Sequence, residues 1–399
     1  MNFLKFNGST IKDAFYEKNF SFLALIACLF LLPLSINLSS FFLFLAIGLK
    51  LVQLLFFKQE LFMVNSLRRS SFIGLFLFIY IILISVGQSN LSYTISIFEG
   101  EFSHLTLFFL IPMLLSSKED NMSLIISFFI GLAVACLYVL IMTFILQIGF
   151  DRNAFERILD IHHTYLAMYL LFFINFLLVK YFTNSQGATY KRNIIYGSIV
   201  IITFSIIFML NSKVAVVIFS IILIGYLITY FSKKNTLRYI LIFSVLILGI
   251  FLFNKKLSIN YKRALDFRLE IWQESLNCIK ESPFVGNLKM EEKDLLNLKH
   301  YLNGKYYLMD SNLNSHNQYL SIFLKYGIIG FLIIAIFIMN AINTLNKSTS
   351  KRCIKEAIGV GVIVLITFYI ENVLDRHHGI VFCTVFYNYY LVAIQNENI

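Results

Sequence analysis

The sequence is poor in charge, in proline and in tryptophan. Asp, Glu, Lys and Arg together make up 14% of its 399 residues, and it contains 3 Pro and 1 Trp. A soluble domain carries roughly 25% charged residues, because its surface must be hydrated. The low charge therefore excludes an ordinary soluble domain.

Cysteine is also scarce and shows no paired spacing. The chain has 5 Cys and no CxxC motif, and the polar stretch at 255–316 contains a single thiol, that of Cys278. These features indicate neither a disulfide in that stretch nor a cysteine zinc site. No DxD-like carboxylate motif accompanies the outer segments described below. We predict no bound metal and no cofactor.

Apolar side chains are abundant, at 58% of the chain, and they occur in long runs. A run of about 20 apolar residues is long enough to cross a bilayer as an α-helix. We predict an all-α polytopic membrane protein with about 12 transmembrane helices and one long loop containing short helices. Residues 1–254 would hold helices 1–9, residues 255–316 the loop, and residues 317–399 helices 10–12. The predicted spans are 19–36, 39–57, 71–87, 103–116, 123–148, 161–182, 194–211, 214–231, 238–254, 317–342, 354–372 and 379–395.

Basic residues in the short connecting segments predict the orientation. With the N-terminus inside, the inner segments carry 17 Lys and Arg residues and the short outer segments carry 4. Because Lys and Arg concentrate on the cytoplasmic side, both termini are predicted to be cytoplasmic and the long loop to lie outside.

Cations and histidines nevertheless gather on the predicted outer face. A single cation at the end of a span is usually an anchor whose charge reaches the interface. For the whole set, convergence on an anionic ligand is the better interpretation. The set comprises Arg152, Arg157, Lys213, Arg376, His162, His163, His377 and His378 in the short segments, and Lys262, Arg263, Arg268 and His316 in the loop.

The loop sequence predicts an amphipathic helix that ends at Pro283 and Gly286. Its apolar residues recur at spacings of three and four, which is typical of one buried helix face. A second, more polar helix is predicted at about 290–302. The predicted stripe of the first helix is Leu265, Leu269, Trp272, Leu276 and Ile279.

Several of the outer residues suit phosphate chemistry. Arg268 and Arg376 carry the forked guanidinium that matches phosphate oxygens, although an Arg on a loop helix is usually solvated. Lys213 is either a turn anchor on a tight hairpin or a point charge that holds a phosphate. If phosphate chemistry occurs, these side chains rather than a metal would stabilise it.

His316 is the candidate proton acceptor. Imidazole exchanges a proton near neutral pH, so His316 could deprotonate a hydroxyl, although a lone His is more often structural. Asn317 follows it at the start of the tenth predicted span. His163, in the stretch HHTYLAMY, opens the sixth span on the same side, where it either binds substrate or lies at the interface.

Four stretches resemble the bacterial O-antigen ligase and O-antigen polymerase family. The family's loop motif is similar to FRLEIWQESLNCIKESPFVG, and its His-Asn motif is similar to HNQYLSIFLKYGIIG. HHTYLAMYL and ENVLDRHHGIVF are similar to stretches in some members. The chain departs from the family by having Lys213 where many members have Arg, a single Gly286 after the Pro, and Arg-His-His-Gly at 376–379.

The resemblance implies a metal-independent, inverting glycosyltransferase of the bacterial inner membrane, active on its periplasmic face. The donor would be a glycan on undecaprenyl diphosphate. The acceptor would be a sugar hydroxyl of lipid A-core in a ligase, or of another lipid-linked glycan in a polymerase. The implied catalytic residues are His316 and Arg268, and the implied substrate-binding residues are Lys213, Arg376, His163, Asn317 and Arg263.

A twelve-span secondary transporter is the alternative from another class. Transporters usually place charged or unwound sites near the middle of the bilayer and contain internal repeats. Here the predicted spans are nearly free of charge, with Lys50 the main exception, and the polar groups gather outside. The distribution favours an enzyme.

Overall fold

The computed structural model describes residues 19–56, 63–88, 108–115, 122–183, 190–230 and 255–396, apart from the side chains of 88, 190–193, 230, 255–266 and 396. Helices account for the regular structure in these residues, and the described part contains no strand. The all-α prediction is therefore confirmed for this part of the chain.

Most helices occur where the sequence predicts spans. Residues 108–114 are helical within the predicted fourth span, whereas the predicted ninth span at 238–254 lies outside the described residues. The helices in the predicted spans are α2 (Phe20–Leu31), α3 (Ile36–Leu55), α4 (Asn65–Gln88), α6 (Met122–Leu146), α8 (His163–Thr183), α9 (Tyr190–Met209), α10 (Lys213–Tyr230), α15 (Gln318–Leu345), α16 (Lys351–Phe368) and α17 (His377–Asn396). The remaining elements are α7 (Arg152–Leu159), α12 (Lys255–Glu281), α13 (Glu292–Leu302), α14 (Tyr306–Met309) and the 3₁₀ turn η1 (Val373–Asp375).

Among the described residues, five helices are long and apolar enough to cross a membrane: α3, α4, α6, α8 and α15. Three shorter apolar segments, Phe20–Leu31, Ile194–Met209 and Lys213–Thr229, accompany them. Length and composition thus support a polytopic helical membrane protein. The number of twelve spans stays a prediction.

Helix α8 forms the centre of the main core. In its most apolar window 78% of the residues are buried, against 28–39% in the other four long apolar helices. Its aromatic rings pack with rings from α6 and α17, for instance Phe172 with Phe386 at a centroid distance of 4.5 Å. Such ring pairs add about 0.5–1.5 kcal/mol each beyond the apolar area that they bury.

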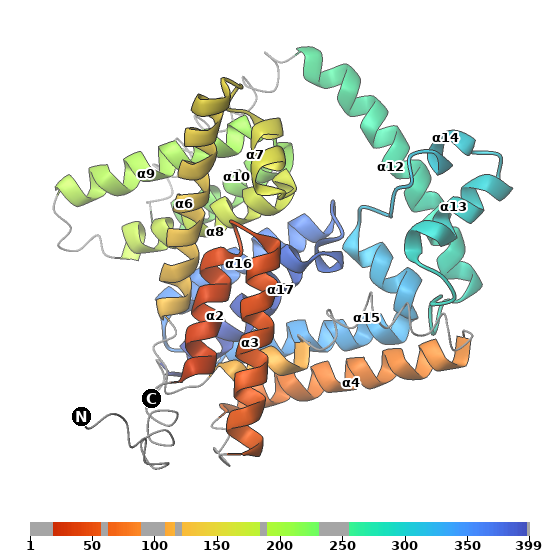
Figure 1. The fold of residues 1–399 in the computed structure, drawn as a ribbon, viewed down its shortest axis with the longest axis horizontal. Helices are drawn as coiled ribbons and strands as arrows, with labels where there is room; N and C mark the ends of the chain where they lie inside the picture. The colour runs from red at the N-terminus through yellow and green to blue at the C-terminus, as the bar shows by residue number, and fades with distance from the viewer. Residues whose placement is uncertain are drawn as a thin grey trace, which may run out of the picture.

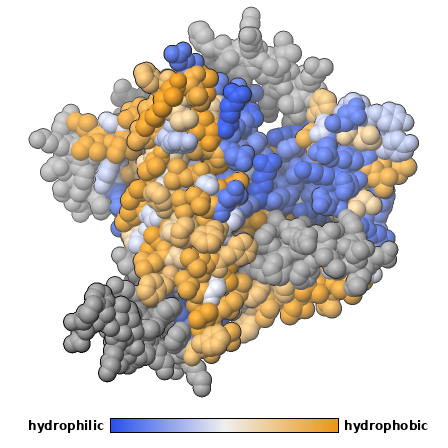
Figure 2. All heavy atoms as spheres, in the orientation of Figure 1, coloured by the Kyte–Doolittle hydropathy of each residue, from blue (hydrophilic) through white to orange (hydrophobic). Residues whose placement is uncertain are grey.

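The remaining helices surround this core. Helices α4 and α15 pack against each other and run across the direction of α2, α3 and α6 (Figure 1). Apolar side chains cover the visible surface of α2, α3, α4 and α6, whereas hydrophilic side chains gather over α12, α13 and α14 (Figure 2). The polar part of the molecule is therefore concentrated in the segment between α10 and α15.

The predicted apolar stripe of the loop helix is wrong in part, because Ile279 packs against the small core while two of the predicted leucines are exposed. Leu269 and Leu276 are 50% and 48% exposed, whereas Ile271 and Cys278 are 1% and 2% exposed. The buried face is the one that packs against α13, α14 and α15, in a small core that includes Leu296. Spacing alone could not choose between the two faces, because the buried one also contains polar residues, Glu274 and Ser275.

Two glycines join the end of the loop helix to α15. Gly286 and Gly327 both have positive φ, 71° and 62°, and their backbones touch. Amide N–H groups on each side donate across the junction, from Asn287 to the Leu324 carbonyl at 2.7 Å and from Ile328 to the Pro283 carbonyl at 2.9 Å. A Cβ on Gly286 would lie 2.4 Å from the Lys325 carbonyl oxygen. The Pro-x-x-Gly ending thus docks the loop on the kink in α15.

Replacing Gly286 with Ala is expected to destabilise this junction by about 3 kcal/mol. The left-handed conformation costs a β-carbon about 1–2 kcal/mol, and the collision with backbone atoms adds about 1–3 kcal/mol. Gly304→Ala is the matched control, since Gly304 has φ 69° but nothing within 4 Å of its Cβ position. Thermal unfolding of the purified variants should show the larger loss for Gly286→Ala. Equal losses would mean that the close approach contributes nothing.

Candidate active site

A buried carboxylate connects histidines from two distant parts of the chain. Glu371, in the segment between α16 and η1, has an Oε1 atom 3.4 Å from His316 Nδ1 and an Oε2 atom 4.0 Å from His162 Nδ1. His316 directly precedes Asn317 at the start of α15, and His162 directly precedes α8. Side chains separated by 209 positions, 162 to 371, therefore meet at one point.

The charge of Glu371 is maintained despite its burial. Burial opposes ionisation of this carboxyl group, but the neighbouring His316, His162 and Arg376 outweigh it and lower its pKa below the usual value. Burial also lowers the pKa of His162, to about 4, assisted by repulsion from His163. At neutral pH the site thus holds a carboxylate beside a neutral His162.

Asn372 holds the segments around Glu371 together. Its side-chain oxygen accepts hydrogen bonds from the Asn317 backbone N–H at 2.8 Å and from the Ser315 hydroxyl at 3.3 Å. Its amide group donates to Asp375 at 2.9 Å and to Glu292 at 3.3 Å. The amide is buried, and each of its polar atoms has a protein partner, so it fixes the start of α15 against the 371–376 segment.

Asn317 is the N-cap of α15. Its side-chain oxygen accepts from the backbone N–H groups of Tyr319 and Leu320, at 3.0 and 3.2 Å. This satisfies donors that a helix start would otherwise leave unpaired. His316, one residue earlier, has a left-handed backbone with φ 45°. The cap thereby fixes the backbone next to His316, just before the helix begins.

Both helices α12 and α13 of the loop are hydrogen-bonded to the segment at the start of α15. Trp272 of α12 donates its indole N–H to the Ser315 carbonyl at 2.9 Å. Glu292, at the start of α13, accepts from the Ser315 backbone N–H at 2.8 Å and from the Ser321 hydroxyl. Lys325 of α15 lies 3.0 Å from Asp375. These contacts make the loop part of the rigid frame around His316.

His163 contacts a different carboxylate. Its Nδ1 lies 2.6 Å from Glu156 Oε1, and Arg152 Nε lies 3.2 Å from the same oxygen. Glu156 comes from α7, a short helix that the sequence analysis did not predict. One donor atom each from Glu156, His162 and His163 lies within 4.8 Å of the others, which makes this group the candidate metal set among the described residues.

The other predicted site residues differ in their exposure and in their contacts. Arg376 is exposed at the end of η1, and its charge acts on both Glu371 and His162. Arg268 is half-buried on α12 and makes no hydrogen bond or ion pair with another described residue. Lys213 is the first residue of α10 and is half-buried. Arg263 belongs to the part of α12 whose side chains lie outside the described residues.

The structure adds residues that the sequence analysis did not select for the site. Glu371 and Asn372 stand in the C-terminal stretch that suggested the family, but only Arg376 was selected from it. Glu292 lies in a polar helix of the loop. The available signal was the ENxxD spacing at 371–375, which places three polar side chains where an apolar span ends.

Residues 198–335 match the family model for O-antigen ligase. Through this segment the chain is similar to the O-antigen ligase family. The match includes Lys213, Arg268, His316 and Asn317. Comparison with curated proteins found no significant match.

This match confirms the resemblance to the O-antigen ligase family that the motifs indicate. The matched segment covers 198–335, so Arg376 and the residues around Glu371 lie after it, and His162 and His163 lie before it. The structure joins the two parts, because His316 of the matched segment faces Glu371.

Proposed function

We propose that this chain is a membrane glycosyltransferase that moves a glycan from undecaprenyl diphosphate to a sugar hydroxyl, with lipid A-core as the acceptor. The observation that carries the proposal is the placement of His316 at 3.4 Å from the buried Glu371, beside the exposed cation Arg376. A base with an orienting carboxylate and a nearby cation is what transfer from a diphosphate to a hydroxyl requires.

In the proposed step His316 accepts the proton of the acceptor hydroxyl. Glu371 faces Nδ1 and favours the tautomer that carries its proton there, which leaves Nε2 as the base. The hydroxyl oxygen then forms a bond to the anomeric carbon as the bond from that carbon to the diphosphate oxygen breaks. Because attack comes from the face opposite the leaving group, the anomeric configuration inverts.

The departing lipid diphosphate carries away the bonding electrons as negative charge. Arg376 and Arg268 can pair with its oxygens in a bidentate manner, and Lys213 can add a point charge. The partial exposure of these three residues supports this assignment, since a substrate must reach them. Side chains rather than a metal ion would stabilise the leaving group, and no cofactor takes part.

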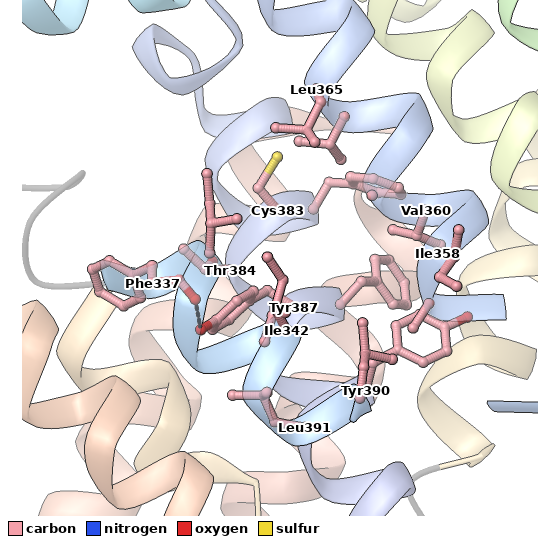
Figure 3. A pocket seen from close by; sticks show the side chains of 18 of the residues that line it. Phe337, Ile342, Ile358, Val360, Leu365, Cys383, Thr384, Tyr387, Tyr390 and Leu391 are labelled. Atoms are coloured by element: carbon pink, nitrogen blue, oxygen red, sulfur yellow. Dashed lines mark hydrogen bonds between the residues drawn. The ribbon is translucent and has the colours of Figure 1, made fainter. Parts of the chain in front are cut away.

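An apolar groove gives the lipid tail a place to bind. It has a volume of about 300 Å³ and lies between α15, α16 and α17 (Figure 3). Its lining runs from Leu345 and Ile394, near the ends of α15 and α17, to Leu374 in η1. Leu374 is three residues from Glu371 and two from Arg376. A polyprenyl chain in this groove would bring its diphosphate to the candidate site.

The remaining predicted residues receive supporting functions in this proposal. Asn317 positions His316 through its cap of α15, and His163 borders the acceptor side next to His162. Arg263, five positions before Arg268 in the sequence, stays a predicted substrate-binding residue. The loop at 255–316 and this site would face the periplasm, with both termini in the cytoplasm and the spans in the bacterial inner membrane.

A surface-polysaccharide polymerase of the same family is the second candidate, because the family match applies to both acceptors. Electrophoresis of surface glycans from a deletion strain separates them. A ligase mutant is expected to lose all O-antigen attached to lipid A-core while still making lipid-linked polymer. A single repeat unit on lipid A-core would establish the polymerase instead, and unchanged surface glycans would overturn both.

A further inference from the structure

A carboxylate and two imidazoles form a group at the start of α8 that the proposed transfer step does not use as a unit. Glu156 comes from α7, His162 from the turn that follows it, and His163 is the first residue of α8. Asp160 in this turn has a left-handed backbone with φ 53°, so the chain folds back and brings the histidines onto Glu156. One nitrogen or oxygen atom of each residue lies within 4.8 Å of the others.

His162 gives an independent sign that a ligand is missing from this group. Its Nδ1 atom is buried and has no hydrogen-bond partner among the residues that the structure describes. A buried polar atom without a partner costs about 1–3 kcal/mol, and such atoms are rare in native proteins.

The chemistry of the group suits a divalent transition metal. Two imidazole nitrogens and one carboxylate are a common zinc ligand set, which leaves a fourth position for water or another group. Hard cations such as Mg²⁺ prefer oxygen ligands, so the imidazoles favour zinc and its neighbours.

Two arginines oppose a cation here. Arg152 lies 3.2 Å from Glu156, and Arg376 acts on His162. The side chain of Arg152 is 42% exposed and can turn toward solvent when a metal takes its place at Glu156. The repulsion should make the site weaker than a structural zinc site, and therefore reversible.

We propose that Glu156, His162 and His163 bind one divalent transition metal ion of the zinc class at the outer end of α8. The ion takes no part in the transfer step, and the proposal stands or fails independently of the proposed function. Its binding joins α7 to α8 beside Glu371.

The test is a titration of the full-length protein with ZnCl₂. The protein is purified in detergent without a polyhistidine tag, stripped with chelator and titrated calorimetrically. One zinc ion per chain is expected at this site. His162→Ala, His163→Ala and Glu156→Gln should each weaken the affinity at least about tenfold, the scale on which even supporting residues of metal sites act. His377→Ala is the matched control, because His377 bonds to Ser39 and Ser40 outside the group. The zinc affinity of this variant should equal that of the unmodified protein.

X-ray absorption at the zinc edge provides the second measurement. The proposal predicts nitrogen and oxygen ligands at about 2.0–2.2 Å from the zinc ion, together with scattering from the imidazole rings. The imidazole scattering should be weaker in His162→Ala. Absence of zinc binding, or binding that the three variants leave unchanged, would overturn the proposal. Glu156→Gln preserves the size of the side chain, and its unfolding curve without metal shows whether a loss of binding reflects misfolding.

Discussion

His316→Ala is expected to reduce glycan transfer by about 10²–10⁴-fold, the usual contribution of a positioned general base. The variant keeps the cap of α15, since Asn317 and its bonds to Tyr319 and Leu320 are unchanged. The fold should therefore survive while the proton acceptor is lost. Transfer is measured with purified protein in liposomes, a lipid-linked glycan donor and lipid A-core acceptor.

His377→Ala is the control for this loss. It removes an imidazole from the start of α17 that bonds to Ser39 and Ser40 rather than to Glu371. Its transfer rate should remain close to that of the unmodified protein. A His316→Ala protein that folds and transfers glycan at the full rate would refute the function of His316 as the base.

Glu371→Gln is expected to cause the second large loss, again about 10²–10⁴-fold. An amide that replaces an orienting carboxylate can turn its NH₂ group to the imidazole and stabilise the wrong tautomer. It also leaves the protonated His316 without a counter-charge during the reaction. The rate should fall with little change in donor binding, because the carboxylate does not contact the diphosphate in the proposed arrangement.

Glu270→Gln is the matched control for Glu371→Gln, since Glu270 is a carboxylate on α12 that bonds to Tyr307 outside the site. Acid stability gives a further readout. The lowered pKa of Glu371 means that its ionised form stabilises the fold above the usual carboxyl pKa, and this contribution is lost as the pH falls through the lowered value. Glu371→Gln should remove that part of the acid dependence. If it lowered donor affinity without lowering the rate, Glu371 would be a substrate ligand instead.

The helices and the membrane class could be predicted because they depend on local pattern. Apolar runs of the length of α6 and α15 allow few structures other than a long buried or membrane helix. The polar helix α13 was also predicted, from the loop alone. The buried face of α12 was not, because Ile271 and Cys278 are buried by α13, α14 and α15, whose packing on α12 the spacing within α12 does not show.

The site could be predicted only in part, for the same reason. His316, Asn317 and Arg376 stood out as polar residues at the ends of spans, and the structure places His316 and Arg376 near Glu371. Glu371 itself gave a weaker signal, since a single acidic residue at the end of a span is commonly solvated. Its importance follows from two histidines that the fold brings to it from residues 162 and 316.

The central claim is that His316 and Glu371 act as one unit in glycan transfer. A double-mutant cycle with His316→Ala, Glu371→Gln and the double variant measures this directly in the liposome assay. Residues that act as a unit have grossly non-additive effects, so the double variant should be about as slow as His316→Ala alone. If the double variant lost the product of the two single-variant factors, the residues would act independently and the account would be wrong.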